Sequence, residues 1–272
     1  MGKKKILFAS QEIYPYLPET ESSNIGLGLP QKSIELGNEI RVFLPKFGTI
    51  KEKTNNLHEV IRLSGMNLII DDFDHQLIIK VASIQSARMQ IYFIDNEEYF
   101  KRKATFYDEG TRFFEDNDQR AIFFCRGVIE TVKKLGWAPD IIHCHGWLAS
   151  FMPLYLRKFH YDDPMFADSK IVYSVYTDKD QEVPATLTDN LKFDGIDGED
   201  LARYENASVE SLNRAALSYS DGAVIASEGA NTETKDFAFA NVSNTIDISQ
   251  DENPAVKVGE LYEQIAVEES VA

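Results

Sequence analysis

Two histidines separated by a single residue carry the clearest chemical groups in the sequence. His143 and His145 end the apolar run that starts at Asp140. Alternate residues of a strand point to the same side, so both imidazoles face one side of the predicted strand while Cys144 faces the other. Ligands bind α/β sheets at the carboxyl ends of their strands. Two interpretations stay open: His145 contacts a polar ligand, or both histidines are satisfied core residues. No third ligand lies nearby, so no metal site is predicted.

Other patterns that carry chemistry are absent from the sequence. It contains no G-x-S-x-G, no P-loop and no C-x-x-C motif. Gly26-x-Gly28, followed by Pro30, lacks the third glycine of a dinucleotide-binding fingerprint. We therefore predict no cofactor.

The charge of the chain limits the classes of partner. Lys and Arg total 28 against 44 Asp and Glu, which gives a net charge of -16 at pH 7. Nucleic acids and anionic lipids are bound largely by neutralising their phosphates with basic side chains. We therefore predict neither a nucleic acid nor a membrane as a partner.

Length and cysteine content indicate one globular domain in a reducing compartment. The 272 residues are 43% apolar, enough for one sizeable core. The two cysteines make no disulfide framework. The apolar run Ile6–Ala9 is too short for a signal peptide, and no stretch approaches the roughly 20 apolar residues of a membrane helix. The expected location is the cytoplasm.

The elements that must position the histidines alternate between short apolar runs and longer segments with helical periodicity. This alternation is typical of βαβ units and predicts an α/β fold with a doubly wound, mostly parallel sheet. The predicted strands are Lys5–Ser10, Glu39–Leu44, Asp140–Cys144, Lys170–Tyr176 and Gly222–Ala226. The predicted helices are Ile25–Leu36, Asp116–Leu135, Trp147–Phe159 and Leu201–Tyr219.

Two segments depart from this alternation. Leu57–Asp95 reads as successive strands with short connections, a local antiparallel excursion. Ser227–Val242 is polar with little periodicity, and Asn244–Ile248 is a candidate short strand. Asn253 is a good N-cap for a last helix, Pro254–Ile265. Its expected packing stripe consists of Val256, Leu261 and Ile265.

Five segments in order resemble bacterial glycogen and starch synthases. They are K-I-L-F-A-S-Q-E-I-Y-P-Y from Lys5, L-P-Q-K-S-I-E-L-G-N-E-I-R-V-F-L-P-K-F-G from Leu29, D-N-E-E-Y-F-K from Asp95, D-I-I-H-C-H-G-W-L-A-S from Asp140, and L-N-R-A-A-L-S-Y-S-D-G-A-V-I-A-S from Leu212. Each match is modest by itself. Their common order and register, from residue 5 to about residue 228, make the resemblance specific.

The resemblance implies one Rossmann-like half of a two-domain GT-B fold. Residues 1–228 correspond to the N-terminal domain, and residues 229–272 form an extension expected to fold onto it. Enzymes of this family transfer glucose from ADP-glucose or UDP-glucose to an α-1,4-glucan. Their catalytic Arg, Lys and Glu belong to the second domain, which has no counterpart in these 272 residues, so no catalytic residue is assigned here.

The donor-binding turn of the family has lost its chemistry in this sequence. The family motif K-T-G-G-L-A-D corresponds, without gaps, to the stretch from Pro18 to Asn24. Pro18 stands in place of the cation, and Glu19 follows it. Thr20 and Glu21 stand where the glycines would let backbone amides approach a phosphate. Two carboxylates beside a diphosphate repel it by roughly a kcal/mol each. An ordinary surface loop is the expected structure.

Two positions of the family's sugar site are retained, and a third is lost. By resemblance, His145 corresponds to a sugar-contacting histidine, but Gly146 replaces the aspartate that follows it. Asp116 corresponds to an aspartate that lines the sugar site, although it is equally placed to cap the next helix. Tyr176-Thr177 replaces the family's His-Asn.

Together these features predict a glycogen/starch synthase-like domain that is non-catalytic by itself and acts in glucan metabolism by binding a carbohydrate or a protein partner. The candidate ligands are α-glucan and nucleotide sugar, and the candidate partners are a C-terminal GT-B half or a complete synthase. Two alternatives stay open. The chain is half of a split glucosyltransferase, or it is a structural scaffold without a sugar site.

Overall fold

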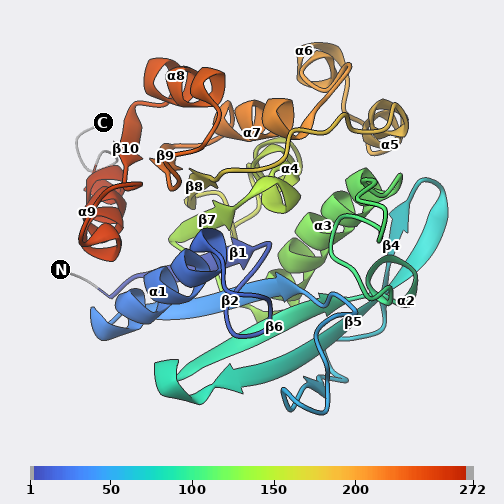
Figure 1. Ribbon diagram of the computed structural model, residues 1–272, viewed down its shortest axis with the longest axis horizontal. Helices are drawn as coiled ribbons and strands as arrows, with labels where there is room; N and C mark the ends of the chain where they lie inside the picture. The colour runs from blue at the N-terminus through green and yellow to red at the C-terminus, as the bar shows by residue number, and fades with distance from the viewer. Residues whose placement is uncertain (1–2, 268–272) are drawn as a thin grey trace.

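A sheet of ten strands organises residues 3–267, which the computed structural model describes (Figure 1). The strand order is β10-β9-β8-β7-β1-β2-β6-β5-β3, and β4 pairs with β5 outside this path. The strands are β1 (Lys5–Ser10), β2 (Glu39–Pro45), β3 (His58–Glu59), β4 (Met66–Ile70), β5 (Phe73–Ile84), β6 (Met89–Asp95), β7 (Ile141–His145), β8 (Lys170–Val175), β9 (Gly222–Ile225) and β10 (Asn244–Asp247).

The central strands are parallel and wind in two directions from one point. From β1 the sheet grows through β2 on one side and through β7, β8 and β9 on the other, all in parallel pairs. The predicted doubly wound, mostly parallel sheet is confirmed. Ligands bind such sheets in the crevice where the winding direction reverses, which here is the carboxyl end of β1 and β7.

Helices cover both faces of the sheet. On one face α1 and α9 lie side by side against β1, β2, β9 and β10, whereas α3, α4 and α7 cover the other face (Figure 1). The helices are α1 (Glu21–Glu35), α2 (Glu97–Phe100), α3 (Asn117–Leu135), α4 (Phe151–Phe159), α5 (Thr186–Phe193), α6 (Gly198–Ala202), α7 (Val209–Leu217), α8 (Thr232–Asn241) and α9 (Pro254–Val267).

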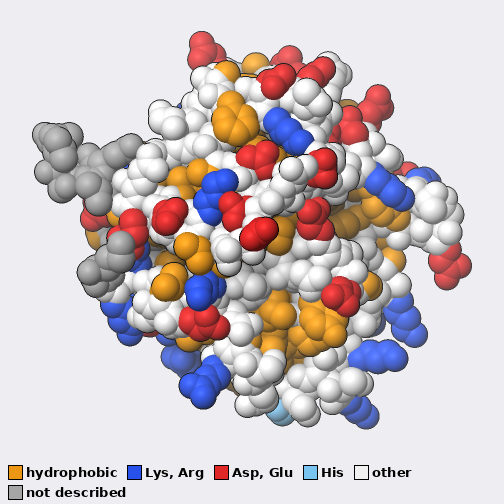
Figure 2. All heavy atoms as spheres, turned by 60° about the vertical axis from the view of Figure 1, so that its left-hand side comes forward, with side chains coloured by type: hydrophobic (Ala, Val, Ile, Leu, Met, Phe, Trp, Pro, Cys, Tyr) orange, Lys and Arg blue, Asp and Glu red, His pale blue; other side chains and the backbone are white. Residues whose placement is uncertain are grey.

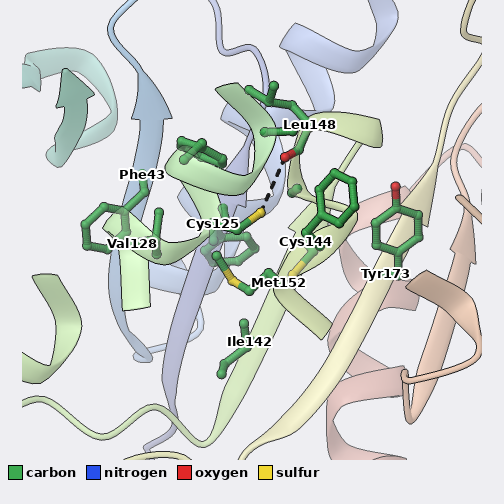
Figure 3. Close-up of a cluster of buried hydrophobic side chains, with 14 of the residues drawn as sticks. Phe43, Cys125, Val128, Ile142, Cys144, Leu148, Met152 and Tyr173 are labelled. Atoms are coloured by element: carbon green, nitrogen blue, oxygen red, sulfur yellow. Dashed lines mark hydrogen bonds between the residues drawn. The ribbon is translucent and has the colours of Figure 1, made fainter. Parts of the chain in front are cut away.

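The core lies between the sheet and these helices. Strand β7 is buried along its whole length, which explains why it reads as a near-continuous apolar run. Figure 3 shows Cys125 of α3 and Cys144 of β7 within this core, among Phe43, Ile142 and Met152. The Cys125 Sγ lies 3.4 Å from the carbonyl oxygen of Leu148 and donates to it. Burial raises the pKa of both thiols, so these cysteines act as small apolar residues.

The helix predicted over Leu201–Tyr219 is wrong, because the chain forms two helices there, α6 and α7. Between them the backbone pairs with another segment: Val183 donates to the carbonyl of Ala207, and Val209 donates to that of Gln181. Ser208 then caps α7, and its hydroxyl accepts from the backbone of Ser211. These tertiary hydrogen bonds replace the helical ones.

Two helices lie in segments that the sequence indicated only as polar. In α8 only Thr234 and Ala238 are buried, so no apolar stripe marks it in the sequence. Helix α5 buries Leu187, Asn190 and Leu191 within an Asp-rich region. The antiparallel excursion is present as β4, β5 and β6, but β6 also pairs with β2 in parallel and so belongs to the main sheet.

The last described helix, α9, packs its apolar side on the sheet. Val258, Leu261, Tyr262 and Ile265 are each at most 3% exposed. Val256, expected in this stripe, is 45% exposed, because it lies on the solvent side of the helix.

On the face turned forward in Figure 2, acidic and basic side chains are interspersed, with apolar side chains between them and no single basic patch. None of the helices among residues 3–267 has the length and apolarity needed to cross a bilayer.

Candidate ligand-binding cleft

A cleft of about 630 Å³ opens at the carboxyl ends of β1, β2, β7 and β8. The loops that follow these strands supply most of its wall, and the segment before α3 supplies the rest. This is the position that the winding of the sheet predicts for a ligand. Its lining consists of Gln11, Glu12, Leu17, Pro18, Thr20, Thr49, Ala104, Thr105, Phe106, Tyr107, Trp147, Thr177, Asp178 and Lys179.

His143 and His145 do not line this cleft, because the chain seals them beneath it. Their rings are stacked with centroids 3.9 Å apart, and the residues are 0% and 2% exposed. His143 Nδ1 is 2.5 Å from the Tyr262 hydroxyl, and its Nε2 is 2.7 Å from the Ser174 hydroxyl. His145 Nδ1 is 2.7 Å from the Tyr176 hydroxyl, while its Nε2 is buried without a partner. This geometry favours the core interpretation of the pair.

Burial keeps both imidazoles neutral. It lowers the pKa of His145 to about 3. It also lowers that of His143, where the neighbouring His145 acts in the same direction. The unfolded chain, with an ordinary histidine pKa near 6.5, therefore binds more protons between about pH 3 and 6.5. The free energy of unfolding contributed by this pair falls as the pH is lowered through that range.

His145→Asn is therefore expected to flatten the acid dependence of stability. When the pH is lowered from 7 to 5, the free energy of unfolding of the wild type is expected to fall by about 2 kcal/mol more than that of the variant. Burial raises the pKa of Asp118 to about 6, which acts in the opposite direction, so the difference between variants is the quantity to measure. Urea titrations at both pH values test it. His58→Asn, on an exposed strand, should match the wild type, and equal pH dependence of all three proteins would contradict the prediction.

The segment that corresponds to the donor turn is only in part the expected surface loop, because α1 begins at Glu21 rather than at Ile25. Thr20 is the N-cap of α1: its hydroxyl accepts from the Ser23 backbone at 3.0 Å, and the Ser23 hydroxyl accepts from the Thr20 backbone at 2.8 Å. The chain's own side chains thus take up donors that an anion at a helix N-terminus would use. Glu21, in the first turn, accepts from the Ser227 hydroxyl, and Glu12 accepts from that of Ser22.

The rest of this segment is stabilised in the same way. The Asn24 side-chain amide donates to Glu19 at 3.2 Å. Pro18 and Thr20 line the cleft. The segment therefore places carboxylates, rather than a cation and glycines, around the start of α1.

Backbone conformation and lack of space explain why a glycine follows His145. Gly146 has φ +77°, a conformation that side chains rarely adopt, and a Cβ there would lie 2.3 Å from the Gln11 side chain. An aspartate at this position would have to displace Gln11, whose side-chain oxygen accepts from the Leu148 backbone.

Asp116 is not among the residues that line the cleft. Its carboxylate pairs with the guanidinium of Arg102, with one oxygen 2.9 Å from Nη1. Asp116 is the N-cap residue of α3, as the capping alternative expected, but its side chain makes no hydrogen bond to the helix. The structure brings the two histidines together, whereas Asp116 is in an ion pair with Arg102.

Asp178 is a cleft residue that the sequence did not single out. Burial raises its pKa to about 7, the charge of Glu210 adds to this, and the amides of Gln11 and Asn213 oppose it. The available signal was an acidic residue just past the end of the predicted strand Lys170–Tyr176, where α/β sheets place ligands.

The chain is similar in sequence to known starch and glycogen synthases. The family of starch synthase catalytic domains matches residues 5–245. The glycogen synthase of Chlorobium limicola is 38% identical over 173 residues, 63% of this chain and 35% of the relative. That of Chlorobaculum parvum is 35% identical over 201 residues, 72% of this chain and 41% of the relative. The chain thus spans about a third of the length of the first of these curated relatives.

A solved structure agrees with the fold. The catalytic domain of Starch Synthase IV from Arabidopsis thaliana, bound to ADP and acarbose, superposes with a TM-score of 0.71 at 15% identity. The match covers 90% of this chain and 51% of that domain. At this identity the likeness concerns the fold alone, and it agrees with one half of a GT-B arrangement.

Proposed function

The chain belongs to the family of starch synthase catalytic domains, and from this membership we propose that it is a glycogen/starch synthase-like domain that binds an uncharged α-glucan in its cleft and does not by itself transfer glucose. The observation that carries the proposal is the start of α1. There Thr20 and Ser23 cap the helix and Glu21 occupies its first turn, where a nucleotide sugar would need free amides and a cation.

Electrostatics support the exclusion of a charged donor. Glu12 and Asp178 line the cleft, and Lys179 is the one cation among its lining residues, all of which are described. The Lys179 ammonium lies 5.1 Å from the centre of the Tyr107 ring. A diphosphate about 4 Å from a carboxylate is repelled by roughly a kcal/mol in water and by more where solvent is excluded.

The same groups suit a neutral saccharide. Carboxylates accept hydrogen bonds from sugar hydroxyls, and binding sites combine such groups with an apolar and aromatic lining. Here Phe106, Tyr107 and Trp147 supply the aromatic surface, and the rings of Phe106 and Trp147 are in contact with centroids 4.8 Å apart.

Calorimetric titration of the 272-residue chain tests the proposal. Maltopentaose is expected to bind with a dissociation constant on the order of 1 mM or tighter, and ADP-glucose at the same concentrations is expected to give no binding heat. The pure chain is also expected to incorporate no labelled glucose into glycogen from ADP-glucose or UDP-glucose. Incorporation above a blank without protein would overturn the non-catalytic assignment.

The alternatives predict different results in the same assays. If a second polypeptide supplies the other half of a split glucosyltransferase, transfer appears when that polypeptide is added. If the chain is a scaffold, neither maltopentaose nor ADP-glucose binds. A complete synthase as partner predicts co-elution with this chain in size-exclusion chromatography.

A further inference from the structure

Asn213 of α7 carries a buried side-chain NH2 group that donates no hydrogen bond. The residue is fully buried, and the Tyr173 hydroxyl donates to its Oδ1 at 2.6 Å. This contact fixes the orientation of the amide, because Oδ1 must face the tyrosine. Its Nδ2 is left without any partner within hydrogen-bond distance.

Asp178 presents an unused acceptor beside this donor. Its Oδ2 is buried and has no hydrogen-bond partner, although the residue lines the cleft. The Asn213 amide lies close enough to oppose the rise in the pKa of both Asp178 and Glu210, and the Gln11 amide does the same for Asp178. The donor on Asn213 and the acceptor on Asp178 therefore belong to one small polar site at the edge of the cleft.

Leaving two such groups unpaired is costly. A buried donor or acceptor without a partner destabilises a fold by about 1–3 kcal/mol. A hydroxyl group satisfies both at once, because it donates through its hydrogen and accepts through its lone pairs. A cation does not fit, since the amide directs its N–H groups into the site. An anion does not fit either, because the negative charges of Glu210 and Glu12 lie close to Asp178 and would repel it.

We propose that Asp178 and Asn213 together bind one hydroxyl of the saccharide held in the cleft, with Asp178 as acceptor and Asn213 as donor. This inference rests on the proposed function and names the residues that select an uncharged polyol. When the cleft holds no saccharide, a water molecule supplies the same hydroxyl chemistry.

Asp178→Asn is the variant that tests the acceptor. It changes shape little, and it replaces a carboxylate buried near Glu210 and Glu12 by a neutral amide, so its melting temperature is expected to equal or exceed that of the wild type. Its affinity for maltopentaose is expected to fall about tenfold, because a charge-assisted hydrogen bond becomes a neutral one. Asn213→Leu, which removes the donor, is expected to weaken binding by a similar factor.

The pH dependence of binding separates a direct contact from a structural role. The carboxylate form accepts from the hydroxyl, and burial raises the pKa of Asp178 to about 7. Wild-type affinity is therefore expected to fall about tenfold between pH 8 and pH 6. In Asp178→Asn the affinity should not change with pH over this range.

The other titratable groups that interact with Asp178 come from four parts of the chain. Glu210 is on α7, Glu12 follows β1, and Tyr107 precedes α3. Tyr173 and Tyr176 are on β8 and directly after it. Asp189→Asn removes a carboxylate that is 78% exposed on α5, so this matched control should follow the wild type at every pH.

The outcomes are distinct. Weaker, pH-independent binding by Asp178→Asn at an undiminished melting temperature supports the inference. Unchanged affinity in Asp178→Asn, with maltopentaose still bound by the wild type, means that the site holds water only; this overturns the inference and leaves the proposed function intact. If the wild type binds no maltopentaose, both fail.

Discussion

Replacing Arg120 with methionine is expected to lower the free energy of unfolding by about 3 kcal/mol or more. Its guanidinium is fully buried and donates to the carbonyls of Tyr99 and Thr105 at 2.8 and 2.7 Å, and to Asn117 Oδ1 at 2.6 Å. The variant leaves these three acceptors unpaired in the interior. It also removes contacts with the rings of Phe47, Phe100 and Phe114.

One effect offsets part of this loss. Burial lowers the pKa of Arg120 to about 9, so the cation itself is costly to bury, and its Nη2 has no partner. Three unpaired acceptors, at about 1–3 kcal/mol each, outweigh that relief. Because Thr105 lines the cleft, we also expect weaker maltopentaose binding by the variant.

Urea denaturation and thermal melts measure the Arg120→Met effect. At about 2–4 °C per kcal/mol for a domain of this size, the melting temperature should fall by about 6–12 °C. Arg112→Met is the matched control. Its side chain is 71% exposed and its ion pairs lie at the surface, so a change within about 0.5 kcal/mol is expected. Equal losses in the two variants would mean that the buried hydrogen bonds contribute nothing.

Ending the chain at Glu252, which removes α9, is expected to leave the domain largely unfolded at 37 °C. Val258, Leu261, Tyr262 and Ile265 are buried against the rest of the domain, at about 1.5–3 kcal/mol for each apolar side chain. The sum approaches the whole stability of an ordinary domain, about 5–15 kcal/mol. The truncation also removes the Tyr262 hydroxyl from His143 and the Glu263 partner of Lys4, 2.9 Å away.

Point variants keep this prediction testable if the truncated chain does not fold. Leu261→Ala is expected to cost about 2–5 kcal/mol, whereas Val256→Ala, on the exposed side of the same helix, should change stability by less than about 0.5 kcal/mol. Circular dichroism melts compare them. A melting temperature unchanged by both the truncation and Leu261→Ala would show that α9 is not needed by the fold.

The sheet could be predicted because its strands carry a local signal. Lys5–Ser10 was predicted to the residue, and the other central strands to within one or two residues. Strands buried on both faces must be apolar over their whole length, and the intervening helices force them into parallel pairs. Helix α8 escaped prediction because its residues are mostly polar and only Thr234 and Ala238 are buried.

The change in the donor turn could also be predicted from residue types. Glycines and a cation favour the approach of backbone amides to a phosphate, so Pro18, Glu19 and Glu21 predict an altered segment from residue type alone. The hydrogen-bond partners of the carboxylates in this segment could not be predicted from the sequence. The partners of Glu12 and Glu21 are Ser22 and Ser227, and the second of these lies some 200 residues away in the chain.

By itself the sequence determined the α/β class and the strands, and it predicted an altered donor turn, because these depend on residue type and short spacing. Only the tertiary structure decided what each polar group contacts. Tyr176, directly after β8, contacts His145 through its hydroxyl. Tyr262 of α9 contacts His143 in the same way. Arg102 forms an ion pair with Asp116. The hydrogen bond from Tyr173 orients the side-chain amide of Asn213 toward Asp178. Such partners meet only after the sheet and its helices have packed, and hydrogen bonding depends on distance and direction in space.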